Sequence, residues 1–558
     1  MAKKLRLNFN ERSDFISPIE KRYPFEQSLW QYPIRQPLEK LIADRFQLDP
    51  AQILCTNGGD EAIMILMRII KESSQLILPL PAFSQYIWGI ESWKLNTQLI
   101  QSNDDLTIDI DGTLSAINSI ADTDVMAPSS VTIITRPNNP TGEMIAIETL
   151  TQIIEAAKNN GGWVFLDEAY IEFSDDADDH VEVTRSLLAQ FDNLVILRTL
   201  SKAYGLAGIR LGYLLGAESL ISEFEKRCAP FNIAQPTLEI AAAALADDNQ
   251  ADVNDFCQKI TSNRNQLFDW FIANKIPVLP SQANFLVLQL PNQQAAAIES
   301  FLAKNGILIR SFTSDDLSNC LRITIPYKIG QLQELLKQAL KPDLICLDMD
   351  GVLIDTSGSY DATIIATVKQ ISGQIIEQSD IDNLKNSGGY NNDWVVSQKL
   401  LEECGFDLKL NEVIDVFQQL YLGESNDGFV SNETPLINSA LINSIKQSSS
   451  TFAIVTGRPL NEANAGKELI NLSELDLISL DCVEQAKPSP EGIKRLQQKY
   501  STMSWMCGDN PDDMQAAVAS NSLAIGIRST NKEPLYEAGA DIVLNNINEL
   551  EDWLCPLN

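Results

Sequence analysis

A lysine in a turn of small residues is the most informative group in this 558-residue sequence. Lys202 lies in the segment Thr199-Leu-Ser-Lys-Ala-Tyr-Gly-Leu-Ala-Gly-Ile-Arg210, directly after an apolar stretch at 195–198 that predicts a β-strand. An amine that is desolvated by apolar walls or flanked by cations loses proton affinity and can attack a carbonyl carbon. A Ser-Lys pair alone is typical of a surface turn, so this interpretation depends on partners elsewhere in the chain.

Asp167 is one such partner, because it ends the predicted strand 163–166 and open α/β sheets bind ligands at the carboxyl ends of their strands. A carboxylate there can pair with a protonated pyridine nitrogen, which makes the ring of pyridoxal phosphate an electron sink. The turn 136–142, Arg-Pro-Asn-Asn-Pro-Thr-Gly, follows another apolar strand and offers Asn139 as a donor to the phenolic oxygen of that ring.

A phosphate site is predicted further upstream. The segment Thr56-Asn-Gly-Gly-Asp-Glu61 precedes a helical pattern at 62–70, so Gly59 and Asp60 would present free backbone N–H groups to an anion. We expect Tyr86, in Pro81-Ala-Phe-Ser-Gln-Tyr86, to stack on the cofactor ring.

In this order the segments resemble the fold-type I aminotransferases, and most closely the histidinol-phosphate aminotransferase family, over about residues 5–340. The resemblance implies a large mixed sheet with a small C-terminal lobe, and pyridoxal phosphate bound covalently through Lys202. Tyr32 matches a family residue that reaches the phosphate of the neighbouring subunit, so a homodimer is expected. The other cofactor contacts that it implies are Asp167 at the ring nitrogen, Asn139 and Tyr170 at the phenolic oxygen, and Ser201 or Thr199 with Arg210 at the phosphate.

The substrate-binding segments of that family are matched by Ala283-Asn284-Phe285, Ile309-Arg310 and Leu321-Arg322-Ile-Thr324. By the resemblance Arg322 clamps an anionic group of the substrate, and an arginine fork suits a carboxylate or a phosphate equally. The chain departs from the family at Pro326-Tyr327, where a Gly-Thr pair is usual, and at Arg136, where Asn is common. Both departures bear on the identity of the amine donor.

A second set of motifs begins with two carboxylates. Asp348-Met-Asp350-Gly follows the apolar segment 344–347, and paired acids after a buried strand need a charge partner, which Mg²⁺ with a phosphate supplies. The same pattern also occurs by chance and in calcium loops. Three further segments place polar residues where they could join the two acids in one site. They are Thr456 after the strand 453–455, Lys487 in Ala-Lys-Pro-Ser-Pro, and Asp509 and Asp513 after the strand 505–507.

This set resembles the haloacid dehalogenase superfamily of phosphohydrolases over about residues 343–555, which implies a Rossmann-like α/β core. By the resemblance Asp348 is the nucleophile that forms an aspartyl phosphate, and Asp350 protonates the leaving oxygen and then activates water. Thr456 and Lys487 would bind the phosphoryl oxygens. The ligands implied for Mg²⁺ are Asp348, Asp350, Asp509 and Asp513.

An insertion of about a hundred residues between the first two motifs has helical periodicity and resembles the helical cap of subfamily I, which we place at about 357–448. Caps exclude water and contact the leaving group. Lys385, Tyr390, Asn392 and Trp394 are expected to face the active site. The alternative is that the Gly-Gly turn among them only joins two helices.

The composition agrees with a globular protein, and 558 residues are too many for one core, so the motifs divide the chain into domains at 1–341 and 342–558. No apolar run approaches the about 20 residues of a membrane span, and the N-terminus has no signal-peptide pattern, so a cytoplasmic location is expected. A net charge of -33 argues against nucleic acid or anionic membranes as partners and leaves small-molecule substrates. The nine cysteines are scattered and show neither a disulfide framework nor a zinc site.

The two resemblances together imply a bifunctional enzyme, and their fusion on one chain suggests consecutive steps of histidine biosynthesis. The first half would exchange amine between histidinol phosphate and 2-oxoglutarate, and the second half would be a Mg²⁺-dependent phosphatase, with histidinol phosphate as the candidate substrate. One alternative is an aminotransferase for another phosphorylated or aromatic compound beside an unrelated phosphatase. Another is a noncatalytic second half that senses a phosphorylated metabolite; the intact acids at 348 and 350 argue against it, because a binding module does not need a nucleophile.

Overall fold

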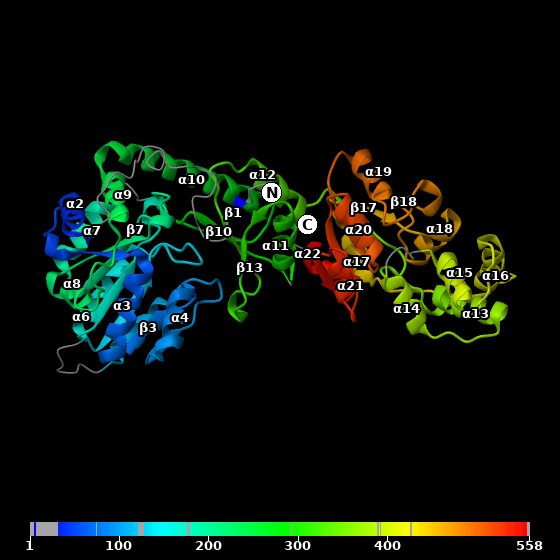
Figure 1. The fold of residues 1–558 in the computed structure, drawn as a ribbon, viewed down its shortest axis with the longest axis horizontal. Coiled ribbons are helices and arrows are strands. Elements are labelled where there is room, and N and C mark those ends of the chain that lie inside the picture. The colour runs from blue at the N-terminus through cyan, green and yellow to red at the C-terminus, as the bar shows by residue number, and fades with distance from the viewer. Residues whose placement is uncertain are drawn as a thin grey trace. The chain divides into compact units, whose positions relative to one another are not determined.

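The computed structural model describes residues 5–6, 32–73, 75–120, 128–175, 179–291, 293–387, 390, 392–424 and 427–554 (Figure 1). The chain forms two compact units. Unit 1 comprises Met1–Ala273, Pro277–Gln289 and Gly306–Ile329, and unit 2 comprises Asn274–Ile276, Leu290–Asn305 and Gly330–Asn558.

A seven-stranded mixed sheet is the centre of unit 1. Its strands, in spatial order, are β2 (Ile53–Asn57), β8 (Leu211–Gly216), β7 (Leu194–Thr199), β6 (Trp163–Asp167), β5 (Ser130–Thr135), β3 (Gln75–Pro79) and β4 (Thr97–Ile100). Neighbouring strands are parallel except where β8 pairs with β2 and β7. Every residue of β5 and β7 is buried, which is typical of a sheet covered on both faces.

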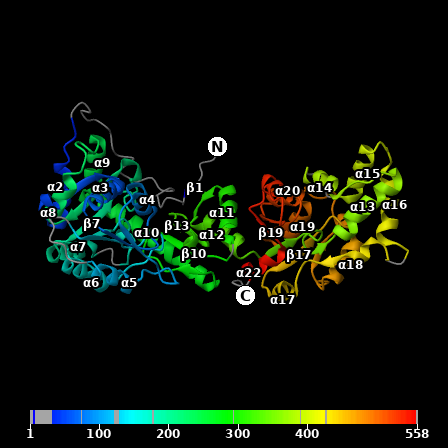
Figure 2. The same ribbon diagram turned by 90° about the horizontal axis from the view of Figure 1, so that it is seen from below.

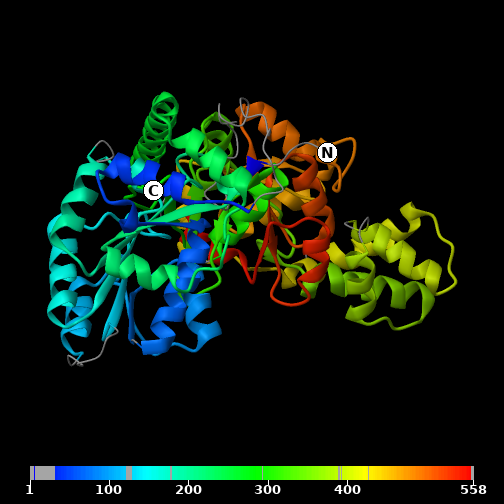
Figure 3. The same cartoon turned by 60° about the vertical axis from the view of Figure 1, so that its left-hand side comes forward.

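Helices lie on both faces of this sheet (Figure 3). They are α2 (Gln36–Phe46), α3 (Gly58–Ser73), α4 (Ser84–Trp93), α5 (Ile110–Asn118), α6 (Ile147–Asn159), α7 (His180–Gln190), α8 (Glu218–Glu225) and α9 (Gln235–Leu245). The long helix α10 (Asp247–Ala273) packs against α9 and against the strands Val278–Leu279 and Phe285–Gln289 of the small lobe. On one face Leu66 of α3 and Phe224 of α8 share a core with Phe165 and Val195 of the sheet. Burial of this apolar side of each helix positions the strand ends that carry the predicted site.

The small lobe of unit 1 contains an antiparallel sheet with the strand order β12 (Arg310–Ser311), β13 (Cys320–Thr324), β10 (Phe285–Gln289) and β9 (Val278–Leu279). Its register pairs Arg310 directly with Arg322. Residues directly opposite on neighbouring antiparallel strands project to the same face, so the two predicted substrate arginines share one face of this sheet. Elsewhere, β1 (Leu5–Arg6) pairs in parallel with β11 (Ile307–Leu308).

A six-stranded parallel sheet forms the core of unit 2, as predicted for a Rossmann-like domain. Its order is β18 (Asp476–Ile478), β17 (Thr451–Val455), β14 (Leu344–Leu347), β19 (Ser504–Gly508), β20 (Leu523–Ile527) and β21 (Ile542–Leu544). The accompanying helices are α17 (Ser439–Gln447), α18 (Leu460–Leu469), α19 (Glu491–Tyr500), α20 (Pro511–Ala519), α21 (Glu533–Glu537) and α22 (Glu551–Leu554).

Helices α11 (Gln294–Lys304) and α12 (Gly330–Leu340) group with unit 2, although the sequence places residues 1–341 together. Ser300 of α11 donates a hydrogen bond to Asp541 at 2.8 Å, and the indole N–H of Trp505 donates to the carbonyl of Gln338 in α12 at 3.0 Å. Ion pairing of Lys304 with Asp541 at 2.6 Å adds to this packing.

Four helices between β14 and β17 form a separate layer of unit 2 (Figure 2). They are α13 (Ala362–Ser372), α14 (Gln378–Asn386), α15 (Asp393–Glu403) and α16 (Leu410–Leu422), and they enclose their own apolar core around Ile364, Leu400 and Phe417. The short pair β15 (Ile354–Asp355) and β16 (Thr434–Pro435) closes the segment. These helices lie within the segment 357–448 that is expected to form a cap, and we call the part from Ser357 to α16 the cap; α17, at the end of that segment, packs against α22.

Candidate active sites

The first candidate site is a cavity of about 880 Å³ in unit 1. Asn139 follows β5, Asp167 ends β6 and Lys202 follows β7, so three neighbouring parallel strands bring these side chains to one edge of the sheet. The predicted residues that line the cavity are Gly59, Asp60, Asn139, Asp167, Tyr170, Thr199, Ser201, Lys202, Arg210, Arg310 and Arg322.

The carboxylate of Asp167 is 5% exposed and accepts two hydrogen bonds. The hydroxyl of Tyr86 donates to its Oδ2 at 2.8 Å, and the backbone N–H of Ala169 donates to its Oδ1 at 3.1 Å. Burial nevertheless raises the pKa of Asp167 to about 6, since both hydrogen bonds only partly offset the loss of solvation. A buried acid of this kind favours a cationic partner such as a pyridinium.

Tyr86 does not lie where the sequence suggested. Its side chain is fully buried behind Asp167 and does not line the cavity, so the prediction that it stacks on the cofactor ring is corrected. Phe83, three residues earlier at the start of α4, lines the cavity instead. The aromatic character of Phe83 was the available signal, but only the direction of α4 decides which of the two rings is exposed to a ligand.

A cradle for an anion lies at the N-terminus of the 16-residue helix α3. The hydroxyls of Thr199 and Ser201 lie 2.9 Å apart, and Arg210 forms an ion pair with Asp60 at 2.6 Å. Gly58 has φ +72°, and a Cβ atom there would lie 2.5 Å from Nη2 of Arg210. Helix N–H groups, hydroxyls and a guanidinium form a donor set that fits a phosphate.

Arg322 connects the small lobe to the sheet edge. Its Nη1 donates to Oδ1 of Asn139 at 2.6 Å, and the amide nitrogen of Asn139 lies 3.4 Å from the Tyr170 hydroxyl. Burial and the nearby charge of Arg310 lower the pKa of Arg322 to about 10, so the group still carries its charge at neutral pH. The ammonium of Lys202 lies 5.6 Å from the centre of the Tyr170 ring.

Three other residues singled out in the sequence lie away from this cavity. Asn284 is buried and does not line it. Tyr32 is 76% exposed and stacks on Phe231 with ring centres 4.5 Å apart. Arg136 is buried 3.6 Å from Glu168, so this departure from the family pattern contributes to packing behind the site rather than to the cavity wall.

The second candidate site is built around Asp348, directly after β14. The ammonium of Lys487 lies 2.8 Å from Asp348 and 2.5 Å from Asp513, and its charge holds the two buried carboxylates together. Burial raises the pKa of Asp348 well above its usual value, and burial with the neighbouring Asp513 raises that of Asp509 to about 7. Such mutual repulsion favours binding of a cation.

Oxygen atoms of Asp348, Asp509 and Asp513 lie within 4.8 Å of one another, so one metal ion could contact all three. Carboxylate oxygens are the ligands that Mg²⁺ prefers, and the donor set therefore fits this ion. Gly351 has φ +68°, and a Cβ atom there would lie 2.1 Å from Asp509, so the close approach requires glycine.

Asp350 forms an ion pair with Arg458 that the sequence did not predict. Nε and Nη2 of Arg458 lie 2.7 Å and 2.6 Å from Oδ1 of Asp350, and the guanidinium also contacts Glu433 at 3.0 Å. The same guanidinium lies 5.0 Å from the centre of the Tyr360 ring. The position of Arg458 two residues after Thr456 was the only signal in the sequence.

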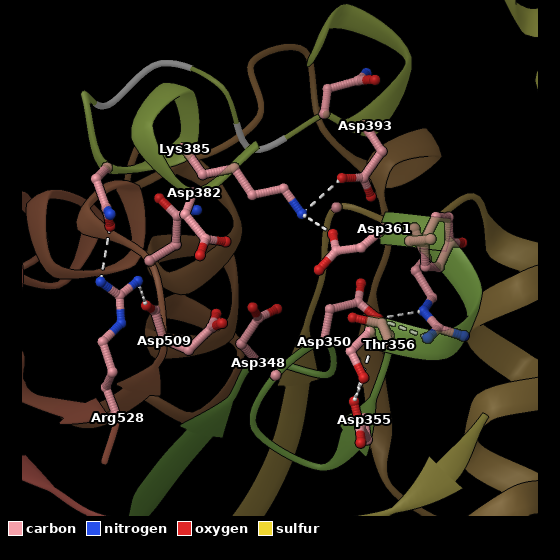
Figure 4. Close-up of a pocket in the computed structure, with 18 of the residues that line it drawn as sticks. Asp348, Asp350, Asp355, Thr356, Asp361, Asp382, Lys385, Asp393, Asp509 and Arg528 are labelled. Atoms are coloured by element: carbon pink, nitrogen blue, oxygen red, sulfur yellow. Dashed lines mark hydrogen bonds and ion pairs between the residues drawn. The ribbon is translucent and has the colours of Figure 1, made fainter. Parts of the chain in front are cut away.

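A cavity of about 320 Å³ lies between these acids and the cap (Figure 4). Lys385, Asn392 and Trp394 line it, as expected, whereas Tyr390 does not and packs against the apolar core of the cap. Thr456 and Lys487 do not line it. Thr456 accepts a hydrogen bond from the N–H of Arg458 at 3.2 Å at the end of β17, and Lys487 contacts Asp348 from behind.

Comparison with known proteins assigns a family to each half of the chain. Residues 27–338 match the model of aminotransferase class I and II, and the chain belongs to this family. Residues 345–527 match haloacid dehalogenase-like hydrolase, so the chain carries two enzyme domains. Pyridoxal phosphate is the cofactor of the first family, and Mg²⁺ is typical of the second. Within the part of the chain that is described, no helix is both long and apolar enough to cross a membrane.

Similar proteins cover most of the first domain. The histidinol-phosphate aminotransferase of Pectobacterium atrosepticum is 33% identical over 311 residues, which are 54% of this chain and 81% of that enzyme. That of a Geobacillus species is 31% identical over 350 residues, 60% of this chain and 90% of that enzyme. The crystal structure of histidinol-phosphate aminotransferase from Sinorhizobium meliloti in complex with pyridoxal-5'-phosphate has a TM-score of 0.50 and 25% identity, and covers 58% of this chain and 87% of that one.

Proposed function

We propose that this chain is a bifunctional enzyme that aminates a phosphate ester at its first site and removes the phosphate at its second. For the first reaction we propose the exchange of amine between histidinol phosphate and 2-oxoglutarate, because the relatives that share 31–33% of their residues carry that name. For the second we propose Mg²⁺-dependent hydrolysis of histidinol phosphate. We pair the two reactions because one chain holds both charged sites, one around Lys202 and one around Asp348.

At the first site, we assign to Lys202 the covalent attachment of the cofactor and the movement of a proton at the substrate carbon. Pyridoxal phosphate, when bound, supplies an aldehyde that accepts the amine and a ring that withdraws electrons. Asp167 would face the ring nitrogen, Asn139 and Tyr170 the phenolic oxygen, and the cradle at the start of α3 the phosphate. Arg322, with Arg310 on the same face, is positioned to bind an anionic group of the substrate.

At the second site, an oxygen of Asp348 attacks phosphorus while the bond between phosphorus and the alcohol oxygen breaks. Asp350 gives its proton to that oxygen, and it then takes a proton from the water that hydrolyses the aspartyl phosphate, so the products are an alcohol and inorganic phosphate. Lys487 and Thr456 would neutralise and orient the phosphoryl oxygens. The carboxylates of Asp348, Asp509 and Asp513, and also Asp350, would hold Mg²⁺, which neutralises developing charge.

Three further assignments belong to this proposal. The functional boundary lies near residue 341, between the two family matches. The enzyme is a homodimer in which Tyr32, which is exposed here, completes the phosphate site of the neighbouring subunit. It acts in the cytoplasm on small-molecule substrates, since a net charge of -33 repels nucleic acid and anionic membranes.

One assay of the purified chain tests both activities. Histidinol phosphate, 2-oxoglutarate, pyridoxal phosphate and Mg²⁺ should yield glutamate and inorganic phosphate. Matched variants separate the sites: Lys202→Ala should lose glutamate formation alone, and Asp348→Asn should lose phosphate release alone. Absence of glutamate formation would refute the aminotransferase substrate, and absence of phosphate release from any ester would favour the noncatalytic alternative for the second half.

A further inference from the structure

The cap presents an excess of negative charge to the second site. Of the cap residues that line the cavity, Asp361, Asp382 and Asp393 carry carboxylates, and Lys385 carries the one ammonium among those described. Lys385 lies 2.9 Å from Asp361 and 3.0 Å from Asp393, as Figure 4 shows. Its charge is thus already shared by two acids. The side-chain amide of Gln378, an uncharged donor, donates to Asp382 at 3.1 Å.

These carboxylates do not form a separate site, because they are the wall opposite the proposed nucleophile. Asp348, Asp350 and Asp509 line the floor of the same cavity, where Lys487, Arg458 and a bound Mg²⁺ would balance their charge and that of a phosphate. At the edge of the opposite wall, Arg528 adds one guanidinium, which donates to Asn386 of α14 at 2.8 Å, so among the described lining residues the three cap carboxylates face two cations, Lys385 and Arg528. An anionic leaving group would be repelled there, whereas an ammonium would find acceptors.

The lining of the wall also includes side chains that interact with an organic cation. Trp394 and Asn392 lie beside Asp393 at the start of α15 and line the cavity with it. An indole face attracts a cation, and this attraction is strongest when water is excluded. The cap thus offers a bound leaving group three carboxylates and an aromatic side chain along one wall of the cavity.

We infer that the second site selects an aminated phosphate ester over the ketone from which the amine is made. This inference rests on the proposed function, in which the first site replaces a neutral carbonyl by a cationic amine. Only the amine would be stabilised by Asp361, Asp382 and Asp393. The charge of the cap thereby orders the two reactions, since the ketone keeps its phosphate until it has been aminated.

Two esters that differ only in this group test the inference: dihydroxyacetone phosphate, a ketone, and serinol phosphate, its aminated counterpart. The full chain is assayed with Mg²⁺ and without amino donor or 2-oxoacid, so that the first site cannot interconvert them. We expect kcat/KM for phosphate release to be at least about tenfold higher for the amine. p-Nitrophenyl phosphate reports whether the site is a phosphatase at all.

The outcomes separate the two proposals. If none of the three esters releases phosphate, the proposed phosphatase function fails. If p-nitrophenyl phosphate is hydrolysed but the ketone reacts as well as the amine or better, the inference about selectivity is overturned while the phosphatase assignment stands.

Charge variants locate the source of selectivity, and each is judged by the ratio of amine to ketone kcat/KM within one protein. Asp382→Asn should lower the ratio several-fold, and Lys385→Gln should raise it. Asp415→Asn removes the same charge from an exposed position on α16 that does not line the cavity, so its ratio should equal that of the wild type. Equal shifts in Asp382→Asn and Asp415→Asn would assign the effect to overall charge and overturn the inference.

Discussion

The hydroxyl of Tyr86 donates a 2.8 Å hydrogen bond to Oδ2 of Asp167, and Tyr86 is buried behind this carboxylate, which lines the cavity of unit 1. The bond stabilises the ionised carboxylate, while burial opposes ionisation and raises the pKa to about 6. Tyr86 thus tunes the acid proposed to face the cofactor ring, although it does not contact that ring.

Tyr86→Phe should lower transaminase kcat/KM by about tenfold. A hydrogen bond to a charged group contributes about 1.5–3 kcal/mol, so its loss should raise the pKa of Asp167 from about 6 by about one to two units and leave the acid largely protonated at neutral pH. Activity measured from pH 6 to 9 should recover at higher pH. Phosphate release serves as the internal control, because the second site lies in the other unit.

Asp167→Asn should stabilise the cofactor-free protein while abolishing transamination. Because the pKa of Asp167 is higher in the folded state than in the unfolded chain, the carboxylate costs stability above pH 6, and this cost falls as the pH drops from 6 toward 4. The free energy of unfolding of Asp167→Asn should exceed that of the wild type by about 3 kcal/mol at pH 7.5, and this difference should shrink toward pH 5. Urea unfolding of both proteins at these two pH values measures it, and a gain that grows toward pH 5 would contradict the assignment.

Lys202→Ala should remove the visible absorbance of the protein after reconstitution with pyridoxal phosphate. Transamination should disappear, because no other amine is proposed to hold the aldehyde, whereas phosphate release should equal that of the wild type. Spectra and both assays on the same preparation provide the comparison. A variant that still transaminates would show that Lys202 is not the attachment site.

Asp348→Asn and Asp350→Asn should have different effects on the phosphatase. The first removes the nucleophile, so phosphate release should stop. The second keeps the nucleophile but loses the acid and base, so a substrate with a good leaving group should still phosphorylate the chain, which then hydrolyses slowly. Burst kinetics with p-nitrophenyl phosphate and intact-mass detection of the phosphorylated chain distinguish them. Unchanged turnover in Asp348→Asn would argue for a noncatalytic second half.

Tyr32→Phe should weaken retention of the cofactor by one to two decades, because one hydrogen bond to a charged phosphate would be lost across the dimer. Dialysis followed by measurement of bound pyridoxal phosphate tests the variant. Sedimentation should give a dimer for the wild type, and an active enzyme that sediments strictly as a monomer would exclude this arrangement.

The predictions for the cap depend on side-chain contacts and orientations that the sequence motifs do not specify. The sequence places Arg458 near Thr456, but its ion pair with Asp350 requires a particular direction of the side chain after β17. Likewise Asp361, Asp382 and Asp393 are spread over three segments of the cap, and none belongs to a recognisable pattern. Charge at a cavity wall depends on which helix faces turn toward the cavity, and periodicity alone does not specify this.

The sequence by itself determined the two enzyme families and the position of each principal residue at a strand end. It could do so because apolar strands followed by polar residues predict parallel sheets whose carboxyl ends lie at one edge, as they do for Asp167 and Lys202 in the sheet of unit 1 and, separately, for Asp348 and Asp509 in the sheet of unit 2. Only the tertiary structure decided that Phe83 rather than Tyr86 lines the first cavity, and that α11 and α12 pack with the second unit. These features arise from the packing of helices against sheets, where side-chain direction and long-range contacts, rather than local spacing, set the outcome.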